Sequence, residues 1–92
     1  MLRGMMPFEF AMEEVGTALS RLGDAFATDD PITRERACYE GRWVYRSMAD
    51  LYPKLQLDST QRDSLVRQLV LLRSRVKERE EEAKRFSDAD SG

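Results

Sequence analysis

Apolar residues recur along the first part of the chain at alternating spacings of four and three, the period of an amphipathic helix. Over residues 7–27 large apolar side chains occupy every position of such a stripe, while Gly16 and Gly23 follow one flank and alanines the other. Small residues beside large ones let neighbouring helices approach closely, so we expect this helix to pack in a small bundle. The expected core stripe is Phe8, Met12, Val15, Leu19, Leu22 and Phe26.

A second helix is predicted over residues 31–52. Asp30 precedes Pro31, and this pair is typical of a helix start, because aspartate caps free N–H groups and proline tolerates the first turn. Pro53 disfavours helical geometry at Tyr52 and should end the helix there. Its expected core residues are Ala37, Gly41, Val44, Met48 and Leu51, with Cys38 as a small buried filler.

A third helix is predicted over residues 59–85. Its cap is Asp58, Ser59 or Thr60, and Asp58 and Gln61 have the spacing of a capping box. The core stripe is Leu65, Leu69, Leu72 and Val76. Beyond Val76 the sequence is charged, and pairs four residues apart, Glu80 with Lys84 and Glu81 with Arg85, favour a solvated helical extension. The whole pattern predicts an all-α, three-helix antiparallel bundle, with a single domain over residues 1–86 and a frayed, disordered tail over 87–92.

Composition narrows the possible chemistry. The 92 residues include no histidine and one cysteine, which excludes Cys/His zinc sites, Ser-His and Cys-His nucleophiles and disulfide frameworks. Adjacent carboxylates such as Glu13 and Glu14 do not share a helix face and make poor acid/base pairs. We therefore expect no catalytic, cofactor-binding or metal-binding residues, and a protein that is not an enzyme.

Charge is unevenly distributed. The net charge is −2, which does not suit a general nucleic-acid or membrane binder. Residues 8–30 hold six acidic residues and one arginine, whereas residues 31–57 and 58–76 are each basic overall. No apolar run has the length of a signal peptide or a membrane span, and a single cysteine suits a reducing compartment. We expect a cytoplasmic protein without a membrane partner. The excess of arginine over lysine hints at a GC-rich bacterial or phage genome.

The second predicted helix carries an additional apolar patch. Projected at about 100° per residue, Ile32, Tyr39 and Trp43 lie opposite the core stripe. Tryptophan, tyrosine and arginine dominate the residues that contribute most to protein interfaces. The candidate partner interface is Ile32, Arg36, Tyr39, Arg42, Trp43 and Arg46.

Three interpretations of this patch remain open at the level of sequence. In the first interpretation, the third helix or a folded-back segment Met1–Met6 covers Trp43. Alternatively, the patch binds another protein or a second copy of the chain, as in an adaptor, an assembly subunit, a homodimer or a small inhibitor encoded by a phage or mobile element. The third is a nucleic-acid-associated regulator, in which aromatic rings stack on bases. Its basic residues would be Arg34, Arg36, Arg42, Arg46, Arg67, Arg73 and Arg75. The favoured hypothesis is a non-enzymatic protein-protein interaction module that uses this face of the second helix and is expected to be homodimeric.

Overall fold

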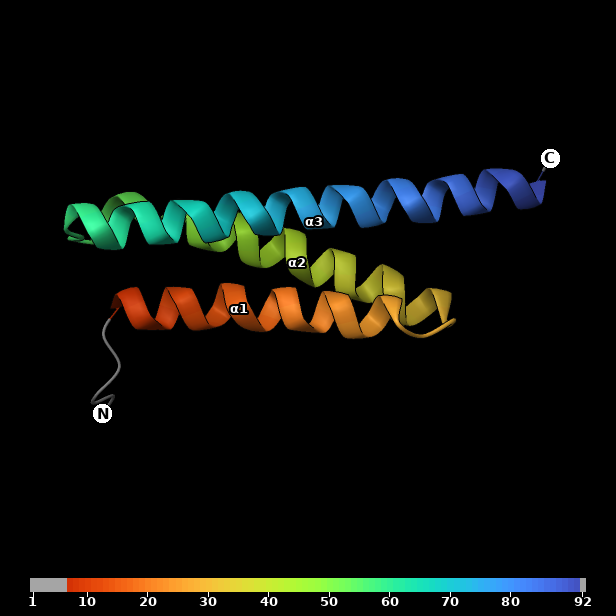
Figure 1. Cartoon of the computed structure of the whole chain (residues 1–92), viewed down its shortest axis with the longest axis horizontal. Coiled ribbons are helices and arrows are strands. Elements are labelled where there is room, and N and C mark those ends of the chain that lie inside the picture. Colours follow the sequence, from red (N-terminus) through yellow and green to blue (C-terminus); the bar gives the residue numbers. More distant parts are fainter. Residues whose placement is uncertain (1–6, 92) are drawn as a thin grey trace.

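The computed structural model describes residues 7–91, with side chains over residues 7–85. It contains three helices, α1 (Pro7–Phe26), α2 (Pro31–Leu51) and α3 (Ser59–Ser91), and one short 3-10 turn, η1 (Tyr52–Lys54). Each helix packs against the other two, and α2 runs obliquely from the end of α1 to the start of α3 (Figure 1). Consecutive helices run in opposite directions. The predicted all-α three-helix bundle is confirmed.

The third helix is longer than predicted. Its backbone continues to Ser91, whereas the sequence pattern placed its end near residue 85. Glutamate, lysine and arginine are strong helix formers and occupy most of residues 77–85, which accounts for the predicted helical extension. The backbone stays helical for six residues beyond it. The C-terminal part of α3 extends beyond the ends of α1 and α2 (Figure 1). The division into a domain of residues 1–86 and a disordered tail stays a prediction.

Both predicted caps are formed. The Asp30 carboxylate accepts a hydrogen bond from the backbone N–H of Ile32 (3.1 Å) and another from the Thr33 hydroxyl. At the start of α3, Asp58 accepts from the backbone N–H of Gln61 (2.8 Å). The Gln61 side chain accepts in return from the Asp58 N–H (3.3 Å). This is a reciprocal capping box. Both caps satisfy N–H groups that would otherwise lack partners at a helix start.

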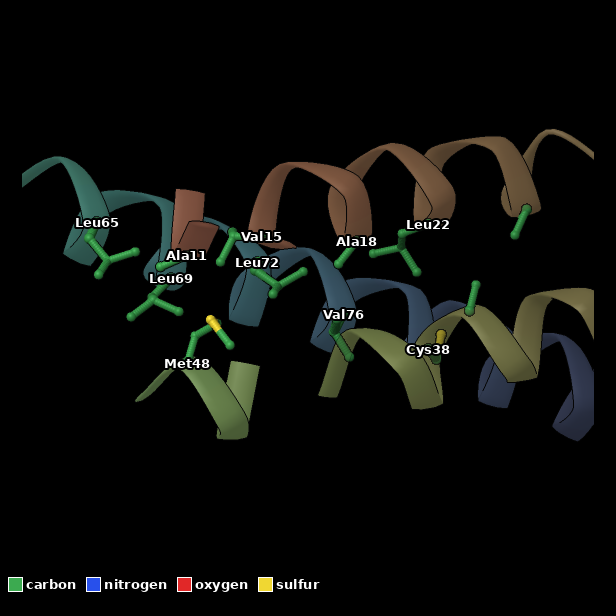
Figure 2. Close-up of a cluster of buried hydrophobic side chains, with 12 residues drawn as sticks. Ala11, Val15, Ala18, Leu22, Cys38, Met48, Leu65, Leu69, Leu72 and Val76 are labelled. Atoms are coloured by element: carbon green, nitrogen blue, oxygen red, sulfur yellow. The ribbon is translucent and has the colours of Figure 1, made fainter. Parts of the chain in front are cut away.

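The core lies along the axis where the three helices meet (Figure 2). Val15 and Leu22 of α1 point toward Leu72 and Val76 of α3, and Met48 contributes from α2. The predicted stripe of α3 is entirely buried, and Cys38 is buried as expected. Each fully buried aliphatic side chain contributes about 1.5–3 kcal/mol through removal of apolar surface from water.

The buried arc of α1 differs from the predicted one. Ala11, Ala18 and Ala25 are buried together with Val15 and Leu22, whereas the remaining large residues of the predicted stripe are only partly buried against this core. The reason is that α1 contacts both α2 and α3. Its buried arc is centred between these two neighbours, and alanines there allow a close approach. The partly buried residues are Phe8, Met12, Leu19 and Phe26.

The glycines of α1 do not provide the close helix contact that the sequence suggested. A Cβ atom at Gly16 or Gly23 would meet no atom within 4 Å, so both face open space. The tight approach occurs at Gly41 of α2, where a Cβ would lie 2.6 Å from Cγ2 of Val76. The close contact is therefore between α2 and α3.

Candidate functional site

Large apolar side chains are exposed to solvent on the outward face of α2. Ile32 is 67% exposed, Tyr39 63% and Trp43 60%. They follow one another at helical spacing, on the side of α2 opposite to the buried Ala37, Gly41 and Met48. A helix packed against two others has a single remaining solvent face, and here that face holds the only tryptophan of the sequence.

The exposure of Trp43 excludes one of the interpretations that the sequence left open. The interpretation in which the third helix covers Trp43 is wrong, because α3 packs against the Gly41 side of α2 and leaves most of the indole open. The other form of that interpretation, a cover formed by Met1–Met6, lies outside the described residues.

Tyr39 and Trp43 form a ridge between two grooves. On one side lies a groove of about 510 Å³ between α2 and α3, hereafter the basic groove. On the other side lies a smaller groove of about 370 Å³ between α1 and α2. Both aromatic residues line both grooves. The further walls of the basic groove include Arg46 and Asp50 from α2 and Arg73, Lys77 and Glu80 from α3.

The basic groove has an excess of positive charge. Four basic side chains, Arg42, Arg46, Arg73 and Lys77, line it against the two carboxylates of Asp50 and Glu80. Arg42 is partly neutralised, because its Nε lies 2.9 Å from Oε2 of Glu80. Its guanidinium also lies 6.0 Å from the centre of the Tyr39 ring, within the range of a cation–π contact.

Among the described side chains, the other three basic residues of this groove have no such partner. Within the part of the chain whose side chains are described, Arg46, Arg73 and Lys77 form no ion pair. They line the same groove as the exposed indole of Trp43, so the groove combines apolar contact area with an excess of positive charge.

The smaller groove is electrostatically balanced. Arg21 of α1 lies 3.5 Å from the Glu40 carboxylate of α2, and both residues line this groove together with Glu14. The ion pairs Arg21–Glu40 and Arg42–Glu80, which join α2 to α1 and to α3, therefore lie on opposite sides of the Tyr39/Trp43 ridge. The charge pairs that the sequence pattern predicted for Glu80 and Glu81 are replaced: Glu80 binds Arg42, and Arg79 pairs with Glu82 at 3.0 Å.

Four of the six predicted interface residues come together. Tyr39, Arg42, Trp43 and Arg46 line the basic groove. Ile32 and Arg36 lie nearer the start of α2, exposed on the same face but outside both grooves. Arg73, which also lines this groove, was predicted only as a basic residue of the nucleic-acid alternative, and Lys77 was not predicted as part of any site. Both lie beside Val76 in the α3 helix, but only the packing of α3 against α2 decides which flank of the stripe faces Trp43.

Two arginines of α2 and α3 have a structural role at the α1–α2 junction. The guanidiniums of Arg34 and Arg79 lie 5.2 Å and 5.0 Å from the centre of the Phe26 ring. Arg34 also donates a hydrogen bond to the Phe26 carbonyl (3.4 Å), at the end of α1 where carbonyls lack helical partners. Arg34 is thereby removed from the freely accessible basic surface that the sequence suggested.

Cys38 does not have the environment of a reactive thiol. It is buried, and burial, followed by the nearby charge of Glu80, raises the pKa of its thiol. A raised pKa keeps the group protonated and poorly nucleophilic.

Among the described residues no group of three His, Cys, Asp or Glu side chains is placed to hold a metal ion. No helix there has the length and apolar character needed to cross a membrane. Comparisons with protein-family models, with curated proteins and with solved structures find no match.

Proposed function

We propose that this protein is a non-enzymatic interaction module that binds another protein through the outward face of α2. The observation that carries the proposal is the 60% exposure of Trp43 on a ridge between two grooves. Large exposed apolar patches with a polar rim typically mark interaction sites. An adaptor, an assembly subunit, a homodimer and a small inhibitor of a partner all use such a surface, in a cytoplasmic location consistent with a single free cysteine.

The chemistry of the ridge supports this function. Tryptophan and tyrosine bury large areas at a low cost in side-chain entropy, and arginine supplies planar hydrogen-bonding groups at an interface. Tyr39, Trp43 and Arg46 provide these three residue types on consecutive turns of one rigid helix. A site built on a helix whose other side is packed requires little reordering on binding, so more of the contact energy remains for affinity.

The test is a pull-down from nuclease-treated bacterial lysate with the wild-type chain, Trp43→Ala and Phe10→Ala as bait. Phe10 of α1 is also an exposed aromatic residue (41%) and is outside both grooves, so it controls for the general loss of a surface ring. Both variants should fold, as checked by circular dichroism, because surface substitutions usually change stability only slightly.

The proposal requires that the wild type and Phe10→Ala capture the same protein, and that Trp43→Ala loses it. Loss of a central interface residue typically costs about 2 kcal/mol or more in binding, which is roughly a thirtyfold loss of affinity. Equal capture by all three baits would place the binding surface elsewhere and refute the proposal.

The alternative function is a nucleic-acid-associated regulator. The observation in its favour is that Arg46, Arg73 and Lys77, which have no ion-pair partner among the described side chains, line the same groove as Trp43. An indole with nearby cations is a combination that single-stranded nucleic-acid binders use. This function requires affinity for a 20-nucleotide single strand that falls steeply with salt concentration, since phosphate binding releases counterions. Absence of binding even at low salt would eliminate it.

A further inference from the structure

Extending the proposed function, we infer that the basic groove between α2 and α3 is the docking site for an acidic, amphipathic helix of a partner protein. The inference rests on the proposed function, and it specifies the chemistry of the partner. Its basis is the juxtaposition of Trp43 with three cations, Arg46, Arg73 and Lys77, that have no ion-pair partner among the described side chains.

The shape of the site favours a helix as its occupant. The α2 wall of the groove extends from Tyr39 to Asp50, which at 1.5 Å per residue is about 16 Å, or three helical turns. Recognition by strand addition needs an exposed strand edge, and residues 7–91 contain no strand. An amphipathic helix lying in a groove between two helices uses its apolar residues at spacings of three and four as anchors, and these would contact the indole of Trp43.

The charge of the groove favours acidic residues along the edges of that helix. Arg46 is on the α2 wall, and Arg73 and Lys77 are on the α3 wall, so both helices that form the groove contribute cations. Carboxylates on both edges of a bound helix would find partners without displacing the existing Arg42–Glu80 pair. Such complementarity raises the association rate and selects against basic partners.

The same charges disfavour two other occupants. A nucleic-acid strand places a phosphate at every nucleotide, and its path through the groove would meet the carboxylates of Asp50 and Glu80. A second copy that presented the same face by two-fold symmetry would bring arginines against arginines. A peptide helix avoids both conflicts, because its few carboxylates can be placed opposite the cations alone.

The experiment is a selection from a displayed library of random 16-residue peptides against the wild-type chain, followed by fluorescence-anisotropy measurement of the enriched peptides. We expect enriched sequences with aspartate and glutamate beside apolar residues at helical spacing. Their affinity should fall about tenfold or more for the double variant Arg73→Glu/Lys77→Glu, since like charges then face each other. Arg67→Glu is the matched control, because Arg67 is exposed on α3 outside both grooves.

A second variant changes affinity in the opposite direction. Glu80→Gln removes a negative charge from the groove and frees Arg42 from its 2.9 Å pair, so it should strengthen binding of the enriched peptides about threefold or more. A misfolded variant cannot produce tighter binding. This result therefore separates an electrostatic effect in the groove from a loss of structure.

The possible failures are distinguishable. Enriched peptides that lack acidic residues, no enrichment at all, or equal binding by wild type and the double variant would each overturn the acidic-helix inference. So would a sedimentation result showing a second copy in the groove, or a 20-nucleotide single strand that binds in its place. In each of these cases a pull-down lost with Trp43→Ala but not with Phe10→Ala would leave the proposed function standing. A pull-down unaffected by Trp43→Ala would reject the proposed function itself.

Discussion

Gly41 is the residue at which the packing of α2 against α3 is least able to adjust. A Cβ there would lie 2.6 Å from Cγ2 of Val76, and valine is stiff about χ1, so its methyl groups cannot simply rotate away. Overpacking a core typically costs about 1–3 kcal/mol, which outweighs the gain of about 0.5–1 kcal/mol from replacing glycine within a helix. We expect Gly41→Ala to lower the free energy of unfolding by about 1–2 kcal/mol, measured by urea denaturation.

The other glycines provide the control for this prediction. Gly16→Ala and Gly23→Ala should each stabilise the protein by about 0.5–1 kcal/mol, because both positions face open space. The double variant Gly41→Ala/Val76→Ala should be less destabilised than the sum of its two single variants, since the two residues share one contact. Stabilisation by Gly41→Ala would show that α2 and α3 are farther apart than described.

Asp30 links the stability of α2 to pH. Hydrogen bonds from the Thr33 hydroxyl and the Ile32 N–H lower the pKa of its carboxyl group below the ordinary value. A carboxyl group with a lowered pKa in the folded state stabilises the fold above its unfolded pKa, and this stabilisation is lost as the pH falls through the folded pKa. We therefore expect the contribution to be complete at pH 7 and to disappear in the acid range below the ordinary aspartate pKa.

The measurement for Asp30 is the midpoint of urea denaturation between pH 7 and pH 2 for the wild type and Asp30→Asn. Asparagine is also a good helix cap but does not titrate, so the gap between the two proteins should change as the acid range is entered. A gap that stays constant from pH 7 to pH 2 would contradict the assigned pKa direction.

At the scale of single helices, the periodicity of apolar residues and the capping residues predicted the three helices and most of their buried faces. The core stripe from Leu65 to Val76 and both caps depend on residues close together in sequence, and all are confirmed. The arc of α1 was misplaced because two neighbours, not the largest side chains, decide which residues lie at its centre. The helical extension was predicted only as far as residue 85, where the run of charged helix formers ends, so the observed helix end at Ser91 was missed.

The projecting end of α3 supports a prediction at this scale. Side chains 81–85 are exposed, and the helix there extends past α1 and α2 (Figure 1). Removing residues 86–92 should therefore change the free energy of unfolding by less than about 0.5 kcal/mol. Truncation that also removes Val76, which is buried, should abolish cooperative unfolding. A large loss of stability from the shorter truncation, measured by thermal denaturation, would mean that this end packs on the bundle.

At the scale of the whole molecule, the candidate site could be predicted only in part. The exposed face of α2 follows from one helix and its periodicity, so Tyr39 and Trp43 were identified from sequence. The groove beside them is a property of two packed helices. Arg73 and Lys77 become part of the site only when Gly41 brings α3 against α2, and no pattern within a single helix carries that information.

The distribution of charge over the molecule predicts the sign of a salt effect. A two-fold dimer through the outward face of α2 would repeat Arg36, Arg42 and Arg46 on both sides of the contact. Aromatic burial attracts the copies and arginine repulsion opposes it. Salt screens that repulsion, with a Debye length of about 30 Å at 0.01 M and about 8 Å at 0.15 M. A dimer formed through this face would therefore strengthen between these two concentrations, as measured by sedimentation equilibrium, and would be lost with Trp43→Ala. Binding of an acidic helix in the basic groove should weaken over the same range, because salt there screens an attraction.

Self-association that weakens with salt would instead indicate that acidic α1 of one copy contacts the basic groove of another. This is a head-to-tail arrangement, which continues into rings or filaments.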